Sequence, residues 1–382
     1  MKIKRFSVLL LLLFWILCSC KENELSNKEW DDEVYLLEYD VQPSYSNMHG
    51  SVNRYNNVYY IMRDSWLFYY DDESQNSGKL CAKPECSHDN ESCNAYVGAA
   101  LGMQVYNNMI YWADVMPNLS IWRMDLSGNQ RELAMEKTID ISGTKMNSQI
   151  MIHRGYVYYS EIKIDIESGQ NQKIFTLSRF PLEHKEEAEV IYQREDPLLV
   201  NYTCQIDKNQ MYILLDSSLE TGEYERILLS CDLNNGQVKE IWEETSFYFT
   251  TTLMIKEKEL HLLSTKLIED ISYQHRVYSL EEGIWEIQEE GTLPNEFSSV
   301  FLVDGSYVWR IYHDSGVMGY EIENWNHEPV FQGEAEGFIT HIGKDEDGVI
   351  LVVDCFLEED NMEYIVLRVS EAGEEVLLDY TR

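Results

Sequence analysis

The chain has 382 residues and a formal net charge of −37 at pH 7, from 30 basic and 67 acidic side chains. Such a surface repels phosphate backbones, which excludes nucleic acid as a partner and argues against flat binding to anionic lipid. Because 44% of the residues are hydrophobic and 12% are aromatic, the chain is not a disordered acidic one, and it has enough apolar material for a large core.

Residues 1–20 have the pattern of a bacterial lipoprotein signal peptide. Three basic residues precede an apolar run at 8–17, which is too short to cross a bilayer as a helix. The run ends in "LCSC", which resembles a lipobox, and this resemblance implies that Cys20 is acylated as the first mature residue. The alternative is an ordinary cleaved signal with a chance cysteine. Residues 21–33 are polar and predict a tether, so we expect a lipid anchor in the cell membrane that holds the domain on the extracytoplasmic side.

One structural unit then repeats about every 49 residues. Each unit has a short apolar strand, a polar turn, a strand rich in Tyr and β-branched residues, a variable loop, and a closing hairpin. Asn, Asp and Gly occupy the turns, where they tolerate positive φ. The second strands are predicted to begin near Asn56, Asn107, Arg154, Lys208, Glu257, Asp304 and Asp347.

Four strands in a unit of this length predict an all-β fold, a β-propeller with seven four-stranded blades in a single domain over residues 34–382. A lone four-stranded sheet cannot cover its two faces, whereas blades standing in a ring bury both. A pair of β-sandwiches and a β-solenoid are the alternatives. Residues 34–41, "VYLLEYDV", predict one spare strand, which closes the ring against the last blade or belongs to an incomplete eighth unit.

The second repeat carries a recognisable motif. Its "IYWAD…SIWRMDLSGNQREL" resembles the blades of YWTD-type and TolB-like propellers, with Tyr111, Trp112 and Asp114 matching the tetrapeptide and Ala113 replacing its Thr. The whole chain also resembles lipoproteins of anaerobic Gram-positive bacteria that have a similar cysteine-rich insertion after the first blade. These resemblances imply a lipid-anchored propeller without specifying an activity.

The cysteine-rich loop at 80–98 is the densest chemical cluster in the chain. Cys81, Cys86, His88 and Cys93 follow the pattern Cys-x4-Cys-x-His-x4-Cys. Three thiolates and an imidazole could bind a structural zinc ion, the one cofactor that the sequence suggests. The competing interpretation is a disulfide between two of the cysteines, with the third free or paired elsewhere, as is common in exported proteins. Neither interpretation makes the loop catalytic.

Catalytic motifs are not found, and no catalytic residue is predicted. The sequence lacks a Gly-x-Ser-x-Gly elbow, a His-Glu-x-x-His helix and a phosphate-binding loop. Residues 343–349, "GKDEDGV", resemble part of a calcium loop, but Gly343 cannot ligate at its first position, so an acidic turn is favoured. Cys204 and Cys231 fall within one repeat and could be neighbours or small buried hydrophobic residues, and the sequence assigns no role to Cys355. The strand histidines His153, His261, His313 and His341 are expected to be packed rather than catalytic.

These observations favour a non-catalytic, lipid-anchored extracytoplasmic propeller that acts as a binding module at the cell surface. The expected ligand is a protein, a peptide or a glycan held on one face of the ring or in its channel. One alternative is a glycan-active hydrolase or lyase whose catalytic residues are distributed over several blades. The other is a structural accessory lipoprotein of an envelope complex.

Overall fold

The structure, a computed structural model, describes residues 36, 38–40, 52–100, 102–114, 119–137, 144–165, 172–182, 188–266, 272–293, 297–312, 317–356 and 362–381. The predicted signal peptide at 1–20, the tether at 21–33 and His313 lie outside these residues. Within the described residues all regular elements are strands, and none of them forms a helix that could cross a membrane.

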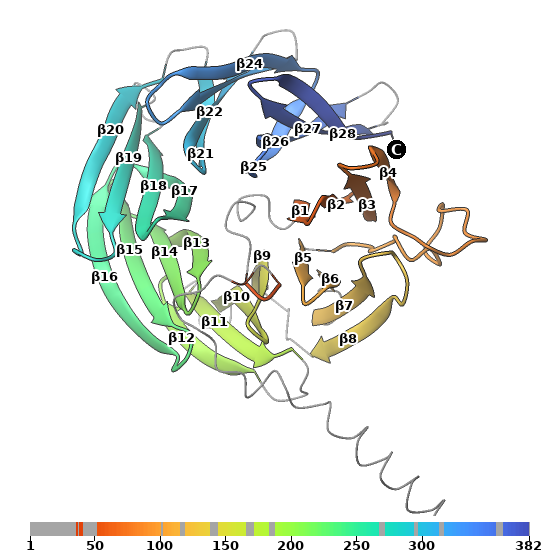
Figure 1. Ribbon diagram of the computed structural model, residues 1–382. Helices are drawn as coiled ribbons and strands as arrows, with labels where there is room; N and C mark the ends of the chain where they lie inside the picture. The colour runs from red at the N-terminus through yellow and green to blue at the C-terminus, as the bar shows by residue number, and fades with distance from the viewer. Residues whose placement is uncertain are drawn as a thin grey trace, which may run out of the picture.

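Seven four-stranded antiparallel sheets stand in a ring, and each sheet is one blade (Figure 1). The first four blades comprise β1 (Val52–Tyr55), β2 (Val58–Arg63), β3 (Trp66–Asp71) and β4 (Asn76–Lys79); β5 (Gly102–Tyr106), β6 (Met109–Asp114), β7 (Leu119–Asp125) and β8 (Glu132–Lys137); β9 (Thr144–His153), β10 (Tyr156–Asp165), β11 (Gln172–Pro181) and β12 (Glu189–Glu195); and β13 (Leu199–Asp207), β14 (Gln210–Ser218), β15 (Tyr224–Asp232) and β16 (Gln237–Ser246). The last three comprise β17 (Phe249–Lys256), β18 (Glu259–Lys266), β19 (Ser272–Ser279) and β20 (Trp285–Thr292); β21 (Phe297–Val303), β22 (Ser306–Tyr312), β23 (Met318–Asn324) and β24 (Pro329–Ala335); and β25 (Phe338–Lys344), β26 (Val349–Phe356), β27 (Met362–Ser370) and β28 (Gly373–Thr381). The predicted seven-bladed propeller is confirmed.

Tight turns between the first and second strands set the register of the blades. Asn56, Asn107, Gly155 and Gly305 occupy such turns with φ between 48° and 87°, a region that Gly and Asn reach at low cost. The second strands begin at these turns, as predicted. We call the side of the ring that carries these turns the turn face. The opposite side, where each blade connects to the next, is the connector face.

The core lies between neighbouring blades, because both faces of the inner strands are covered. In β14, Met211, Ile213 and Leu215 pack into one apolar cluster with blade three, while Tyr212 and Leu214 pack into another with blade five. Burying a side chain of this size contributes about 1.5–3 kcal/mol. Continuous apolar runs are therefore the signature of strands that are sheltered on two sides.

The ring closes where blade seven meets blade one. Both sheets are built from consecutive strands, so in the described residues no strand is shared across the closure. Apolar contact joins the two blades instead: Val352 and Val366 belong to the same buried cluster as Tyr59 and Leu67. The rings of Phe68 and Tyr380 add an aromatic contact with centroids 4.8 Å apart.

The predicted spare strand at 34–41 is wrong for its described residues, Leu36 and residues 38–40. These form a turn, in which the backbone N–H groups of Tyr39 and Asp40 donate to the Leu36 carbonyl at 2.9 and 2.8 Å. The Asp40 carboxylate accepts the Leu36 N–H at 2.8 Å, so a side chain takes the place of a strand partner. The segment lies on the turn face rather than at the closure.

Candidate metal centre

The cysteine-rich loop projects from the outer rim of the ring between β4 and β5 (Figure 1). Its two ends pair with the beginning of β3: the Leu80 N–H donates to the Leu67 carbonyl at 2.9 Å, and the Leu67 N–H donates to the Ala95 carbonyl at 2.8 Å. Trp66 forms a β-bridge with Tyr96. Because both ends are held on one strand, the residues between them fold back into a compact loop.

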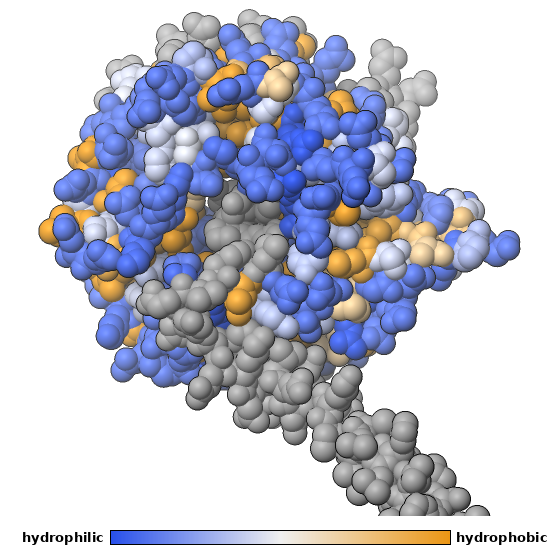
Figure 2. Space-filling view, in the orientation of Figure 1, coloured by the Kyte–Doolittle hydropathy of each residue, from blue (hydrophilic) through white to orange (hydrophobic). Residues whose placement is uncertain are grey.

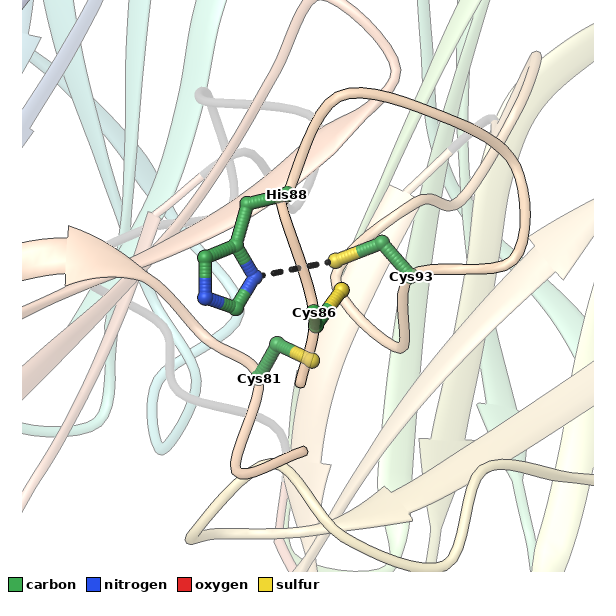
Figure 3. A group of neighbouring side chains, drawn as sticks. All are labelled: Cys81, Cys86, His88 and Cys93. Atoms are coloured by element: carbon green, nitrogen blue, oxygen red, sulfur yellow. Dashed lines mark hydrogen bonds between the residues drawn. The ribbon is translucent and has the colours of Figure 1, made fainter. Parts of the chain in front are cut away.

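All four predicted ligands lie together in that loop. The sulfur atoms of Cys81, Cys86 and Cys93 and a ring nitrogen of His88 lie within 4.8 Å of one another. His88 Nδ1 is 3.4 Å from Cys93 Sγ, and the side chains converge on a common centre in Figure 3. Tetrahedral zinc with Zn–S bonds of about 2.3 Å needs ligand atoms about 3.5–4 Å apart. The ligand atoms, at separations of up to 4.8 Å, are close to this spacing, and a contraction of less than about 1.5 Å would bring them onto one zinc ion.

The local backbone is shaped to bring His88 into the group. His88 has φ of 56°, a left-handed conformation that costs free energy for a residue with a Cβ. The ammonium of Lys79 donates to the His88 carbonyl at 2.7 Å, and Lys83 donates to the Ser92 carbonyl at 2.6 Å. These bonds hold the two arms of the loop together around the four side chains.

Blade two supports the loop from the other side. Asn94 donates to the Gly128 carbonyl at 2.8 Å, and Arg131 donates to the Cys93 carbonyl at 3.0 Å. Gly128 has φ of +86°, and a Cβ there would lie 2.9 Å from the Leu80 carbonyl and the Cys81 backbone. The turn between β7 and β8 thus needs glycine at this contact, and the loop joins blade one to blade two.

The thiols differ in their acidity. Burial by itself raises the pKa of Cys81, but backbone N–H groups of Lys83 and Asn94 donate to its sulfur and lower the pKa below its usual value. Burial raises the pKa of Cys93 to about 12. A bound Zn²⁺ deprotonates a coordinating thiol outright, so its charge would compensate for burying the Cys93 thiolate.

The cysteines of this loop are free thiols in the structure, as are Cys204, Cys231 and Cys355. Cys204 in β13 and Cys231 in β15 lie in one apolar cluster, and burial raises their thiol pKa values to about 12 and about 11. Cys355 is buried as well. Four protein ligands would complete a zinc shell and leave no position for substrate, so the arrangement suits a structural metal.

The strand histidines are packed rather than clustered with the metal ligands. Burial lowers the pKa of His153 to about 4 and that of His261 to about 3, so both are neutral at pH 7. His261 lies beside His275, with ring nitrogens 3.1 Å apart, and His275 is hydrogen-bonded to the Tyr307 hydroxyl at 2.7 Å. His341 is only partly buried.

The acidic segment 343–349 contains the turn between β25 and β26, which lies at the closure of the ring. Asp345 accepts the N–H groups of Asp347 and Gly348 at 2.8 and 2.9 Å. Arg54 of blade one pairs with Asp347 at 2.6 Å and with Asp72 at 3.3 Å. Arg368 of blade seven pairs with Asp72 at 2.9 Å. Arginines from both blades therefore neutralise these carboxylates.

Sequence reasoning missed this ionic closure. Arg63 on β2 pairs with Asp354 on β26, and the Tyr70 hydroxyl donates to Glu375 at 2.6 Å. The partners are 291 and 305 residues apart in the sequence. No local pattern links an arginine near residue 60 to a carboxylate near residue 350, so the pairing becomes visible only when the ring is closed.

Comparisons with known proteins identify the fold. No family model matches the chain, and no curated protein matches it. Prolyl oligopeptidase B from Galerina marginata matches with a TM-score of 0.55 and 8% identity, over 89% of this chain and 52% of that one. Oligogalacturonate lyase from Vibrio parahaemolyticus matches with a TM-score of 0.51 and 11% identity, over 88% of this chain and 91% of that one. TolB from Acinetobacter baumannii matches with a TM-score of 0.42 and 12% identity, over 73% of this chain and 63% of that one.

The chain thus spans about half of the peptidase and less than two thirds of TolB. The peptidase and the lyase share the arrangement at identities of 8 and 11%, so the likeness shows the fold alone and not the chemistry. The sheet topology makes the chain a seven-bladed β-propeller, and TolB is among its structural neighbours.

Proposed function

We propose that the chain is a lipid-anchored, extracytoplasmic propeller that binds a protein partner on its connector face and does not catalyse a reaction. The observation that carries the proposal is the placement of exposed apolar side chains. Leu198, Val200, Phe247 and Phe338 are all exposed, and each lies within two residues of the start of a first strand, β13, β17 or β25. Four large apolar groups near the starts of these three strands, on one face of the ring, are typical of a contact surface.

The charge of the surroundings indicates the chemistry of the partner. Glu195, Glu220, Glu243 and Glu336 are exposed near the same ends of the blades, in a chain whose net charge is −37. A segment with apolar side chains flanked by Lys or Arg would bury the apolar groups and pair with these carboxylates. Such charge pairs mainly accelerate association, so binding should weaken as salt increases.

Photo-crosslinking tests the proposal. The full chain, purified in detergent, carries a photoreactive residue at Thr245 and is mixed with detergent-solubilised envelope of the host cell. We expect a crosslinked protein whose capture falls at least tenfold in Val200→Asp and Phe247→Asp, and falls with added salt. The control Ile287→Asp changes an exposed apolar residue on the outer strand β20 and should leave capture unchanged.

Other outcomes would overturn the proposal. If capture is unchanged in both Val200→Asp and Phe247→Asp, the partner binds elsewhere on the chain. If the captured molecule is a glycan, the ligand is a glycan and not a protein. Turnover of envelope glycans by the purified chain would favour the hydrolase or lyase alternative. The anchor has its own test, because Cys20→Ala should abolish incorporation of a labelled fatty acid.

We propose in addition that Cys81, Cys86, His88 and Cys93 bind one structural zinc ion. The fit of the four ligand atoms within 4.8 Å supports this, together with the lysine and arginine contacts that hold the loop around them. The zinc would fasten the rim loop between blades one and two and would leave both faces of the ring free for a partner.

A further inference from the structure

Residues 38–40 join the ring immediately after the predicted tether, and a buried ion pair holds them there. Asp40 and Arg154 are 2% and 3% exposed. Arg154 Nε donates to Asp40 Oδ1 at 2.7 Å and Nη2 donates to Oδ2 at 3.1 Å, a bidentate contact. Arg154 Nη1 also donates to Asn209 Oδ1 at 2.9 Å. The Asp40 carboxylate is therefore tied to the first-to-second-strand turns of blades three and four.

Backbone bonds fasten the same segment to blades two and three. The Asn107 N–H donates to the Glu38 carbonyl at 2.6 Å, and the Arg154 N–H donates to the Tyr39 carbonyl at 2.9 Å. The ring of Tyr39 meets Tyr106 edge-on, with centroids 5.7 Å apart. The chain thus enters the domain on the turns of blades two, three and four. We call residues 38–40 with Arg154 the entry clamp.

The length of the tether then limits how the ring can stand on a membrane. Leu36 is sixteen positions after Cys20, and at full extension sixteen residue steps span at most about 58 Å. To bring the connector face to the bilayer, they would have to pass outward over four strands, about 14 Å, and then along the six-residue outer strand β8 or the seven-residue outer strand β12, about 20–23 Å. This path of about 34–37 Å exceeds the root-mean-square span of a flexible chain of sixteen residues, about 20–24 Å, so the tether would have to stretch, whereas the turn face can approach without stretching it.

We propose that the entry clamp orients the anchored propeller, with its turn face toward the membrane and its connector face away from it. This inference rests on the proposed lipid anchor. It assigns the two faces different partners: lipid headgroups beneath the polar turn face, and a protein from the cell exterior on the connector face. The exposed Leu198, Val200, Phe247 and Phe338 then lie at the end of the blades farthest from the lipid.

Energy transfer to a labelled bilayer tests the orientation. The chain from residue 21 is joined to a synthetic diacyl peptide and bound to vesicles of neutral phospholipid that contain a lipid-linked acceptor. A donor is attached through an azido amino acid at Asn235 or at Thr221. Both positions are exposed in blade four, at the turn-face end and the connector-face end of β15.

These labels are separated by roughly the length of β15, about 30 Å. We expect transfer from Asn235 to exceed transfer from Thr221 at least twofold. Asp40→Asn and Arg154→Met should each reduce that ratio, because they free residues 38–40 and lengthen the tether. The exposed Lys258→Met, which removes a pair with Glu281 elsewhere on the turn face, should leave it unchanged.

Equal transfer from the two labels, or stronger transfer from Thr221, would overturn the inference. So would an unchanged ratio in both Asp40→Asn and Arg154→Met. Because the lipid is supplied synthetically, this experiment does not depend on acylation in the cell. If fatty-acid labelling at Cys20 fails, the proposed lipid anchor is wrong, but the contacts of the entry clamp are unaffected.

Discussion

The ion pair between Arg63 and Asp354 offers a direct test of how the ring is closed. Arg63 lies on β2 of blade one, and Asp354 lies on β26 of blade seven. Their side chains are 16% and 12% exposed, so neither is well solvated. The Arg63 guanidinium also lies over the ring of Tyr364, 4.9 Å from its centroid. Arg63→Met keeps most of the apolar stem and removes the charge.

The magnitude follows from leaving Asp354 buried without its cation. Breaking a fully buried pair costs about 3–5 kcal/mol, and the lost cation–π contact about 0.5–1 kcal/mol. Because both groups keep some exposure, we expect the free energy of unfolding at pH 7 to fall by about 3 kcal/mol. Urea denaturation of the mature chain, followed by tryptophan fluorescence, measures this loss.

The stability loss in Arg63→Met should also depend on pH, in a direction that the pKa of Asp354 determines. Burial raises the pKa of Asp354, while Arg63 opposes that rise, so Arg63→Met should raise the pKa further. A carboxyl group whose pKa is higher in the folded chain than in the unfolded chain stabilises the fold most at a pH below its unfolded-state pKa. The fold loses this stabilisation as the pH rises through the folded-state pKa. The loss in Arg63→Met should therefore shrink as pH falls from 8 to 5.

A surface pair of the same chemistry provides the control. Arg123 and Glu132 pair at 2.6 Å within blade two, with side chains 34% and 53% exposed. Arg123→Met should cost less than about 1 kcal/mol. If Arg63→Met costs no more than Arg123→Met, or if its cost is the same at pH 5 and pH 8, the ionic account of ring closure is refuted.

Two further predictions concern buried histidine and the rim loop. Burial lowers the pKa of His275 to about 4, so the unfolded chain gains a proton below about pH 6.5 that the folded chain does not, and stability is lost as pH falls from 6.5 toward 4. His275→Gln should therefore flatten the fall in unfolding free energy between pH 6.5 and 5 by about 1.4 kcal/mol per pH unit, whereas His341→Gln should not; equal slopes in the two variants and the wild type would contradict this. Gly128→Ala should destabilise the chain by more than about 1 kcal/mol and speed proteolysis of the loop, because its Cβ would meet backbone of Leu80 and Cys81 at 2.9 Å. Gly222 also has positive φ, but an added Cβ there would have no atom within 4 Å, so Gly222→Ala measures the cost of the backbone conformation alone. Equal losses of unfolding free energy in the two variants would show that the close approach of Gly128 to Leu80 and Cys81 does not contribute.

Much of the fold could be predicted because each blade is built from one continuous stretch of the sequence. Asn107 and Asn108 mark a turn, because asparagine adopts positive φ at low cost. The continuous apolar run of the strand that follows indicates that this strand is buried. The four metal-ligand candidates were also recognisable, since they lie within thirteen residues of one another. In both cases the signal and the structure occupy the same short stretch of chain.

The parts that could not be predicted depend on contacts between distant segments. "VYLLEYDV" has a strand-like composition, yet the Asp40 carboxylate binds Arg154 and the Leu36 N–H, which favours a turn. A pattern of hydrophobic residues cannot reveal that partner. For the same reason Arg63 and Asp354 give no sequence signal, although together they close the ring.

The metal content of the purified full chain tests the candidate site most directly. Elemental analysis should find one zinc ion per chain, with the zinc lost in Cys86→Ser and retained in Cys355→Ser, whose buried thiol lies outside the loop. Peptide mapping under non-reducing conditions should find Cys81, Cys86 and Cys93 uncrosslinked. A metal-free chain with a disulfide between any two of these cysteines would contradict the zinc centre and establish the competing interpretation.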